Sequence, residues 1–515
     1  MKRGLVSLDL GTTSMRAILF DKEGRALGAA GRPTAPLHYS DGRVEQDPAL
    51  WRSALPEILA GCAELARSME VEIVALALTS QRSSVIPVDA RGEPLSAAIM
   101  WQDQRTESLC RELADSTAFV YGRTGLRIGP VFSAIKMTWF RRNEPSIYAA
   151  CHKMLGIHDY VLHLLTGRFV TDRSLASRTN LFNLQSGAWD PELIELFGLD
   201  GRLLCDLVDP GSVVGGLGPA MAEVTGLAEG IPVISAGGDQ QCAALGLGLL
   251  SPGHMVANTG TGSYIIGLAA QPVFDPGMRL SCNVSAIAGR YIVEAGVLSS
   301  GSLYAWFRDR FYTGGDASAG PELGAGGFDL INEEAAQSPP GANGVILLPH
   351  FKGAGSPHWN PSASGIFFGL NLGTKRGDMA RAVLEGIAAE MAQSIELIES
   401  LTGPARELRV AGGLTNFPLY NRIQADMYRR SVLRSADPEA TARGAWISAV
   451  VALGLYPDHA AAQSALSGTR AAAGEVTSRF EPEAHTAELY ARLRARAATI
   501  YAALDSGGAY RITSD

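Results

Sequence analysis

The six cysteines are scattered singly along the chain, with no Cys-x-x-Cys pair and no histidine at metal-ligand spacing. Neither a disulfide framework nor a structural zinc site is therefore expected. No window approaches the ~18 consecutive apolar residues of a membrane-spanning helix. The apolar start of the chain is interrupted at Asp9 before the core of a signal peptide forms. We expect a cytoplasmic protein with no membrane partner.

An excess of basic residues and the common nucleotide-binding motifs are also missing. The chain has 44 Lys and Arg against 52 Asp and Glu, a net charge of -8, and no basic stripe. Nucleic acid is therefore not an expected partner. No lysine follows a glycine, which excludes the P-loop pattern, and no GxGxxG follows a predicted strand, which disfavours a dinucleotide oxidoreductase.

At 515 residues the chain exceeds one hydrophobic core, so we expect two domains. A second strand meander begins at Pro252, which predicts the division into 1–249 and 250–515. The mixture of predicted strands and helices indicates an α/β protein. The chain opens as a predicted three-stranded meander, and the apolar run Val71–Leu78 predicts a strand buried on both faces. Apolar residues every three or four positions from Met379 to Ile398 predict a core helix. The Gly-rich stretch 314–327 predicts a mobile surface loop.

The first predicted hairpin has the form of a phosphate-binding device. An apolar strand ends on Asp9, and a short polar turn leads into a second apolar strand. Backbone N–H groups and hydroxyls at such a turn suit a triphosphate, and the carboxylate beside them suits Mg²⁺. The residues of the turn are Gly11, Thr12, Thr13 and Ser14.

A second copy of this device occurs later in the chain. The strand 253–258 leads into Thr259-Gly260-Thr261-Gly262-Ser263 and then into another apolar strand. Two phosphate-shaped hairpins predict two related lobes that bind one nucleotide.

The segment 412–418 follows a predicted strand and leads into a predicted helix. Its glycines let a flat ligand approach the backbone, and free N–H groups at the helix start favour an anion or a ring edge. By itself it is more typical of an ordinary turn with Asn416 as the cap and Pro418 in the first turn. The two phosphate hairpins favour the nucleotide interpretation.

Asp239 follows a predicted buried strand and two glycines. A carboxylate at a strand end, with space cleared around it, is well placed to take a proton from a substrate hydroxyl. The same pattern is typical of an N-cap aspartate, and the sequence does not separate the two interpretations.

Gln81 and Arg82 end the Val71 strand, and Trp101 ends an inserted hairpin. A guanidinium, an amide and an indole at neighbouring strand ends suit a small polyhydroxylated ligand. The alternative is a surface Arg82 paired with Asp103 beside a half-buried Trp101.

The chain resembles the FGGY family of carbohydrate kinases over essentially its whole length, and its motifs are most similar to those of the glycerol kinases. The segment 133–140, Ser-Ala-Ile-Lys-Met-Thr-Trp-Phe, fits the first family pattern. The second pattern is matched by 344–349 and then by Gly353, Pro357, Pro361, Gly365, Gly369 and Leu370.

This resemblance implies two ribonuclease H-like lobes of the actin and Hsp70 type, with ATP and Mg²⁺ in the cleft and a sugar or polyol against the N-terminal lobe. It implies Asp239 as the catalytic base, Asp9 and Asp239 beside the metal, and a site that works mainly by positioning and charge. The substrate-facing residues would be Gln81, Arg82, Trp101 and Asp239. The ATP-binding residues would be Gly11, Thr12, Thr13, Ser14, Arg16, Thr261, Gly262, Gly301, Gly413 and Asn416. The assembly is compatible with a homodimer.

The chain departs from the glycerol-kinase pattern at two positions. Ser83 stands where that pattern has Glu after Gln-Arg, and Val131 stands where it has an aromatic residue. The glycine-rich segments 237–239 and 245–248 also resemble the ketose and autoinducer-2 kinases of the same family. The other class that remains open is an actin- or Hsp70-like ATPase without a phosphate acceptor.

Overall fold

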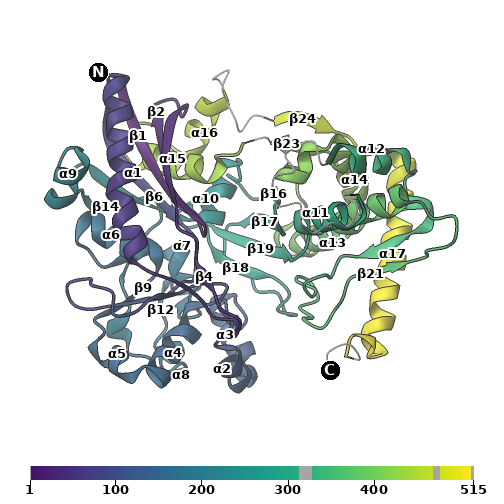
Figure 1. Ribbon diagram of the computed structural model, residues 1–515, viewed down its shortest axis with the longest axis horizontal. Coiled ribbons are helices and arrows are strands. Elements are labelled where there is room, and N and C mark those ends of the chain that lie inside the picture. Colours follow the sequence, from purple (N-terminus) through teal and green to yellow (C-terminus); the bar gives the residue numbers. More distant parts are fainter. Residues whose placement is uncertain (1, 313–327, 436, 468–475, 512–515) are drawn as a thin grey trace. The chain divides into compact units, whose positions relative to one another are not determined.

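The computed structural model describes residues 2–312, 328–435, 437–467 and 476–511 (Figure 1). The predicted loop at 314–327 lies outside these residues. Two compact packing units are present, and neither is contiguous in sequence. Unit 1 is Met1–Leu250, Leu268–Ile292 and Glu439–Gly474, and unit 2 is Ser251–Gly267, Val293–Pro438 and Glu475–Asp515. The predicted division at residue 249 assigns the acceptor to 1–249 and the nucleotide to 250–515, and this assignment stays a prediction.

Unit 1 is built on a six-stranded sheet in the order β14-β15-β6-β1-β2-β3. The predicted meander at the start of the chain is confirmed, since β2 pairs antiparallel with both β1 and β3. The three central strands β15, β6 and β1 run parallel to one another. The strands are β1 (Lys2–Leu10), β2 (Ser14–Asp21), β3 (Ala26–Pro33), β6 (Val71–Ser80), β14 (Ser212–Gly216) and β15 (Pro232–Gly238).

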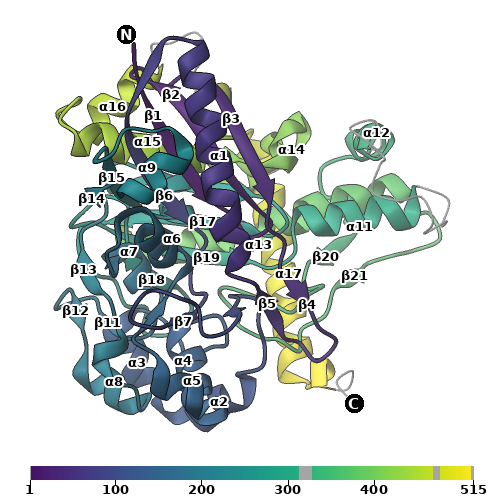
Figure 2. The same ribbon diagram turned by 60° about the vertical axis from the view of Figure 1, so that its left-hand side comes forward.

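Helices cover both faces of this sheet. Successive residues of β1 point to opposite sides, so this strand contributes to the hydrophobic core on each face. Val6, Leu8 and Leu10 join one core with α1 (Ala49–Ser68) and α6 (Ile157–Thr166). Leu5 joins the other core with α10 (Asp239–Gly246), α15 (Ala440–Ala452) and α16 (His459–Ser467). Figure 2 shows α1 lying along β1 to β3. Ala75 to Leu78 of β6 are buried on both faces, which explains its nearly continuous apolar run and confirms the predicted buried strand.

Unit 1 also contains shorter strands and helices. The strands are β4 (Leu37–His38), β5 (Val44–Gln46), β7 (Ile86–Val88), β8 (Ala98–Ile99), β9 (Lys153–Leu155), β10 (Val170–Asp172), β11 (Phe182–Asn183), β12 (Ala188–Trp189), β13 (Asp206–Val208) and β18 (Ser281–Val284). The helices are α2 (Glu107–Glu112), α3 (Thr117–Thr124), α4 (Ser133–Asn143), α5 (Pro145–Ala150), α7 (Arg173–Ala176), α8 (Pro191–Leu196) and α9 (Pro219–Thr225).

Unit 2 contains the strand order β19-β17-β16-β22-β23-β24, part of a seven-stranded sheet. The predicted second hairpin is confirmed, since β16 and β17 pair antiparallel, and β16 then runs parallel to β22. These strands are β16 (His254–Thr259), β17 (Ser263–Ala269), β19 (Tyr291–Val297), β22 (Glu407–Ala411), β23 (Val432–Ser435) and β24 (Val476–Phe480). A short pair, β20 (Ile346–Leu348) and β21 (Ile366–Phe368), completes the strands of the unit.

The predicted core helix of unit 2 is confirmed as α13 (Arg376–Thr402). Val383, Ile387, Met391 and Ile395 are fully buried on its inner face. The other helices of the unit are α11 (Gly301–Phe311), α12 (Asp329–Gln337), α14 (Pro418–Tyr428) and α17 (Ala484–Ser506). Among the described helices, none is long and apolar enough to cross a membrane.

Candidate active site

Three adjacent parallel strands of unit 1 deliver the predicted acceptor-side residues to one edge of the sheet. Asp9 lies near the end of β1, opposite Thr79 of β6, and Gly238 at the end of β15 lies opposite Ser80. Gln81, Arg82 and Asp239 directly follow these strand ends. Ligand sites of α/β sheets form where the carboxyl ends of parallel strands meet.

Arg82 and Asp239 form an ion pair, with Arg82 Nε 3.5 Å from Asp239 Oδ1. Arg82 Nη1 also donates to Gln241 Oε1 at 3.3 Å, and only 10% of the Arg82 side chain is exposed. The alternative pairing with Asp103 is wrong, because Asp103 is fully buried and pairs with Arg105 at 2.8 Å. Arg82 is thus held beside Asp239.

Asp239 is the first residue of α10, and Gly238 is the N-cap. Asp239 is therefore not the N-cap itself, and its side chain accepts from a first-turn N–H, that of Gln240, at 2.7 Å. With 27% of its side chain exposed, the carboxylate remains accessible to a small ligand.

The amide of Gln81 and the indole of Trp101 converge on the first hairpin turn. Gln81 Nε2 donates to the carbonyl of Gly11 at 3.1 Å, and Thr12 Oγ1 donates to Gln81 Oε1 at 3.3 Å. Trp101 Nε1 donates to Thr12 Oγ1 at 3.1 Å. The turn that was predicted to bind phosphate is thereby tied to two residues that were predicted to bind the acceptor.

Burial and the negative charge of Asp239 raise the pKa of Asp9 to about 7, and Arg16 acts in the opposite direction. Arg16 Nη2 in turn pairs with Glu439 Oε1 at 2.6 Å. Thr13 and Ser14 complete this part of the site: Thr13 O accepts from Thr34 N at 2.8 Å, and Ser14 begins β2. Two mutually repelling carboxylates form an oxygen donor set that suits Mg²⁺.

The second predicted phosphate turn, in unit 2, is closely packed around its glycines. Gly260 N donates to Gly262 O at 2.9 Å, and Gly301 N donates to Gly260 O at 2.9 Å. A Cβ atom at Gly301 would lie 2.4 Å from Gly260 O, and one at Gly262 would lie 2.7 Å from Val297 O. Thr261 accepts at its carbonyl from Ser300 N at 3.1 Å, so α11 begins directly against this turn.

The turn after β22 is confirmed as the link between a strand and a helix. Gly412 has φ +98°, and a Cβ atom there would lie 2.2 Å from Thr259 O, so only glycine fits. A Cβ atom at Gly413 would meet nothing within 4 Å, which leaves open space against the backbone. Asn416 Oδ1 accepts from Arg434 Nη2 at 2.6 Å. Gly413 therefore fits the role of a surface for a flat ring.

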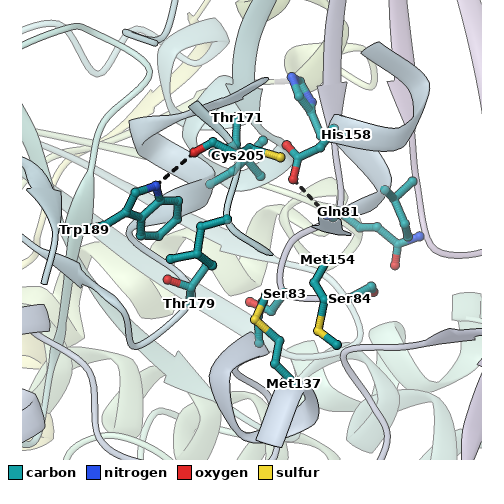
Figure 3. A pocket seen from close by; sticks show the side chains of 16 residues that line it. Gln81, Ser83, Ser84, Met137, Met154, His158, Thr171, Thr179, Trp189 and Cys205 are labelled. Carbon is teal, nitrogen blue, oxygen red and sulfur yellow. Dashed lines mark hydrogen bonds between the residues drawn. The ribbon is translucent and has the colours of Figure 1, made fainter. Parts of the chain in front are cut away.

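A small cavity of about 40 Å³ lies in unit 1 next to Ser83 (Figure 3). Ser83 has φ +71°, and its hydroxyl donates to Arg178 O at 3.3 Å. Ser84 Oγ, which is buried in the cavity wall, has no hydrogen-bond partner among the described residues. The Gln81 side chain points away from the cavity in Figure 3. The space is large enough for an ordered water molecule, which Ser84 could bind.

One residue that the sequence indicated only as part of a family pattern is Lys136 on α4. Its side chain is fully buried, and its Nζ donates to Pro130 O at 2.7 Å and to Val131 O at 2.6 Å. Burial lowers the pKa of Lys136 to about 7. This lysine fixes the segment that carries Val131.

Among the described residues, no group of three or more His, Cys, Asp and Glu side chains forms a metal site, and all six cysteines are free. The pair Asp9 and Asp239 still fits Mg²⁺, because this ion usually keeps several waters and needs only one or two carboxylates besides phosphate oxygens.

The chain belongs to the FGGY family of carbohydrate kinases. The family's N-terminal domain matches residues 5–246 and its C-terminal domain matches residues 255–453. The protein is therefore an ATP-dependent kinase that acts on a small carbohydrate, and the alternative of an actin- or Hsp70-like ATPase without an acceptor is not supported.

Two relatives from curated proteins extend over most of the chain. A glycerol kinase of Alkalilimnicola ehrlichii is 36% identical over 484 residues, 90% of this chain and 93% of its own length. A glycerol kinase of Thermococcus onnurineus is 35% identical over 454 residues, 86% of this chain and 88% of its own length.

Solved structures show the same fold. A xylulose kinase from Rhodospirillum rubrum has a TM-score of 0.88 at 28% identity, covering 98% of this chain and 99% of that chain. A gluconate kinase from Lactobacillus acidophilus has a TM-score of 0.88 at 24% identity, covering 98% of both chains. The predicted two-domain α/β kinase fold is confirmed.

Proposed function

We propose that this protein transfers the γ-phosphoryl group of ATP to a hydroxyl of a polyol, sugar or sugar acid larger than glycerol. The observation that carries the proposal is the meeting of Asp9, Arg82 and Asp239 at the ends of three adjacent parallel strands. Such a site contains a base, a metal-side carboxylate and a cation, which are the parts that phosphoryl transfer needs.

On the acceptor side, Asp239 takes the proton of the attacking hydroxyl at a carboxylate oxygen. Arg82 lies beside that carboxylate and orients it through the 3.5 Å ion pair. Arg82 and the second amide hydrogen of Gln81 bind further hydroxyls or a carbonyl of the acceptor, and Trp101, whose only N–H donates to Thr12, offers the face of its indole. General-base catalysis of this kind contributes about 10²- to 10⁴-fold to the rate.

On the nucleotide side, the turn from Gly11 to Ser14, together with Arg16, binds phosphate oxygens in unit 1. In unit 2, Thr261, Gly262 and Gly301 bind phosphates, and Gly413 and Asn416 bind the base and sugar of the nucleotide. When bound, Mg²⁺-ATP supplies the phosphoryl group and neutralises its charge. Asp9 and Asp239 would hold the ion, and its positive charge would offset their mutual repulsion.

The size of the acceptor is inferred from Ser83 and Val131. A site that lacks a buried carboxylate partner for substrate hydroxyls loses much of its discrimination for that substrate. The short Ser83 side chain reaches only the Arg178 carbonyl and leaves the adjoining cavity unfilled. Both departures act in the same direction, toward a pocket less closely fitted to three carbons.

Glycerol itself is the second candidate acceptor, and one observation favours it. The relatives at 35% and 36% identity over most of the chain are glycerol kinases. A ketose or a sugar acid remains within the first proposal, since Arg82 is able to bind a carbonyl or a carboxylate.

A coupled ADP-release screen over polyols, aldoses, ketoses and sugar acids, at fixed ATP and Mg²⁺, tests both candidates. We expect ADP release to rise with at least one acceptor and the highest kcat/KM to belong to an acceptor with more than three carbons. Glycerol as the best acceptor would reject the first candidate in favour of the second. ATP turnover that no acceptor stimulates would reject both.

A further inference from the structure

A buried chain of polar side chains lies behind the proposed base, and its centre is Asp172. This residue ends β10, is fully buried, and caps α7 by accepting from Ser174 N at 2.8 Å and Leu175 N at 3.3 Å. It is thus an aspartate with a structural role at a helix start, and it also has two further partners.

The hydroxyls of two serines donate to the two oxygens of Asp172. Ser235 Oγ on β15 donates to Asp172 Oδ2 at 2.6 Å, and Ser174 Oγ donates to Oδ1 at 2.5 Å. His158 Nε2 lies 2.8 Å from Ser235 Oγ. Because Ser235 gives its only proton to the carboxylate, the N–H of His158 donates to Ser235. Every donor in this hydrogen-bonded network therefore points toward the Asp172 carboxylate, an arrangement that strengthens each hydrogen bond.

This directionality reaches the residue before the proposed base. Since Ser174 gives its proton to Asp172, its oxygen accepts from the N–H of Gly238 at 3.1 Å. Gly237 has φ +124°, and a Cβ atom there would lie 3.0 Å from Ser174 Oγ, so the backbone turn is shaped around this hydroxyl. Gln241 Nε2, one helical turn further on, donates to the Ser174 carbonyl at 3.3 Å.

We propose that Asp172 and Ser174 are positioning residues for Asp239. They hold the end of β15 through Ser235 and the start of α10 through Gly238, so the Asp239 carboxylate is presented in one orientation. This inference rests on the proposed function, in which Asp239 is the base. A positioning role predicts a loss in kcat at little cost to ATP binding, because misplacing a reacting group by about 1 Å can cost about 10²-fold.

Two variants test the proposal by different routes. Ser174→Ala removes the acceptor of the Gly238 N–H. Asp172→Asn keeps an oxygen for the helix cap but turns an N–H₂ donor toward a hydroxyl that also donates. With the best acceptor from the screen, we expect kcat to fall about 10- to 100-fold in each variant. The Kd of a nonhydrolysable ATP analogue, measured by calorimetry, should stay within about twofold of wild type, since the base does not enter nucleotide binding.

Asp190→Asn is the matched control. Asp190 is also buried and caps α8 by accepting from Glu192 N at 2.9 Å, but its side-chain partners include Asn183 and Arg123 rather than a residue of β15. We expect this variant to lose stability comparable to Asp172→Asn and to keep wild-type kcat.

Amide hydrogen exchange of Gly238, measured on the free protein, is a readout that needs no acceptor. Exchange should be at least about tenfold faster in Ser174→Ala, because a lost hydrogen bond of ~1.4 kcal/mol changes an equilibrium tenfold. Unchanged exchange would overturn the proposal, as would wild-type kcat in Ser174→Ala and Asp172→Asn, or an equal loss in Asp190→Asn. If wild-type protein phosphorylates no acceptor, the proposed function fails, and the exchange result still decides whether Ser174 holds the turn.

Discussion

Replacing Asp9 with asparagine is expected to stabilise unit 1 above pH 7 while abolishing turnover. The carboxyl lies at the end of β1, and burial and the charge of Asp239 raise its pKa from 3.8 to about 7. The folded protein therefore keeps this proton between about pH 4 and pH 7, where the unfolded chain has already lost it. The contribution of Asp9 to stability falls as the pH rises through this window, and its full cost is present above pH 7.

The size of the effect follows from the same rise in pKa. At about 1.4 kcal/mol for each pH unit, the rise to about 7 corresponds to at most about 4 kcal/mol. Relaxation of the site reduces this figure, and we expect a gain of about 1–2 kcal/mol for Asp9→Asn at pH 8, or about 2–4 °C in Tm. At pH 4 both forms are neutral, and the gain should vanish.

Thermal unfolding in EDTA, at pH 4 to 8, measures this difference, since chelation removes any cation that would offset the repulsion. Asp47→Asn is the control, because Asp47 is exposed at the start of α1 and accepts from Ala49 N. A pH-dependent gain for Asp9→Asn alone is the expected result. If Asp9→Asn is no more stable than wild type at pH 8, the account of Asp9 as a strained, metal-side carboxylate is refuted.

Three further variants test other parts of the account. Gly413→Val should weaken the binding of a nonhydrolysable ATP analogue, measured by calorimetry, at least ~10-fold, because the side chain fills the open space at that turn. Gly122→Val, also in open space, is the control. Unchanged affinity in Gly413→Val would contradict the assignment of Gly413 to the nucleotide site. Ser83→Glu should raise kcat/KM for glycerol relative to the best larger acceptor about tenfold, and an unchanged ratio would contradict the reasoning about acceptor size. Lys136→Met should destabilise the protein by about 2–3 kcal/mol in thermal unfolding, because two buried carbonyls lose their donor; a loss below about 0.5 kcal/mol would show that they find another.

Local patterns predicted the elements that present the site. The hairpins β1–β2 and β16–β17 and the buried strand β6 follow from alternation, turn residues and continuous apolar runs. Adjacent residues in the chain were sufficient for these elements. The grouping of Asp9, Arg82 and Asp239 came only from the resemblance to the FGGY family, because no local pattern predicted that their strands are parallel neighbours.

Contacts between distant segments could not be predicted in this way. Arg16 pairs with Glu439, which lies 423 positions further along the sequence. The hydrogen bond from Ser235 to Asp172 joins residues that are 63 positions apart. No motif in the sequence around Asp172 predicted this network. The alternative in which Arg82 pairs with Asp103 is wrong for a related reason: the buried Asp103 carboxylate pairs with Arg105, which stands two residues away.

The role of Asp239 as the base is tested by the turnover of Asp239→Asn with the best acceptor at saturating ATP and Mg²⁺. An amide cannot take the proton of the hydroxyl, so we expect kcat to fall by about 10²- to 10⁴-fold. The Kd of the nonhydrolysable ATP analogue should remain close to that of wild type. Wild-type turnover in a folded Asp239→Asn protein would contradict the assignment of Asp239 as the base and, with it, the proposed mechanism.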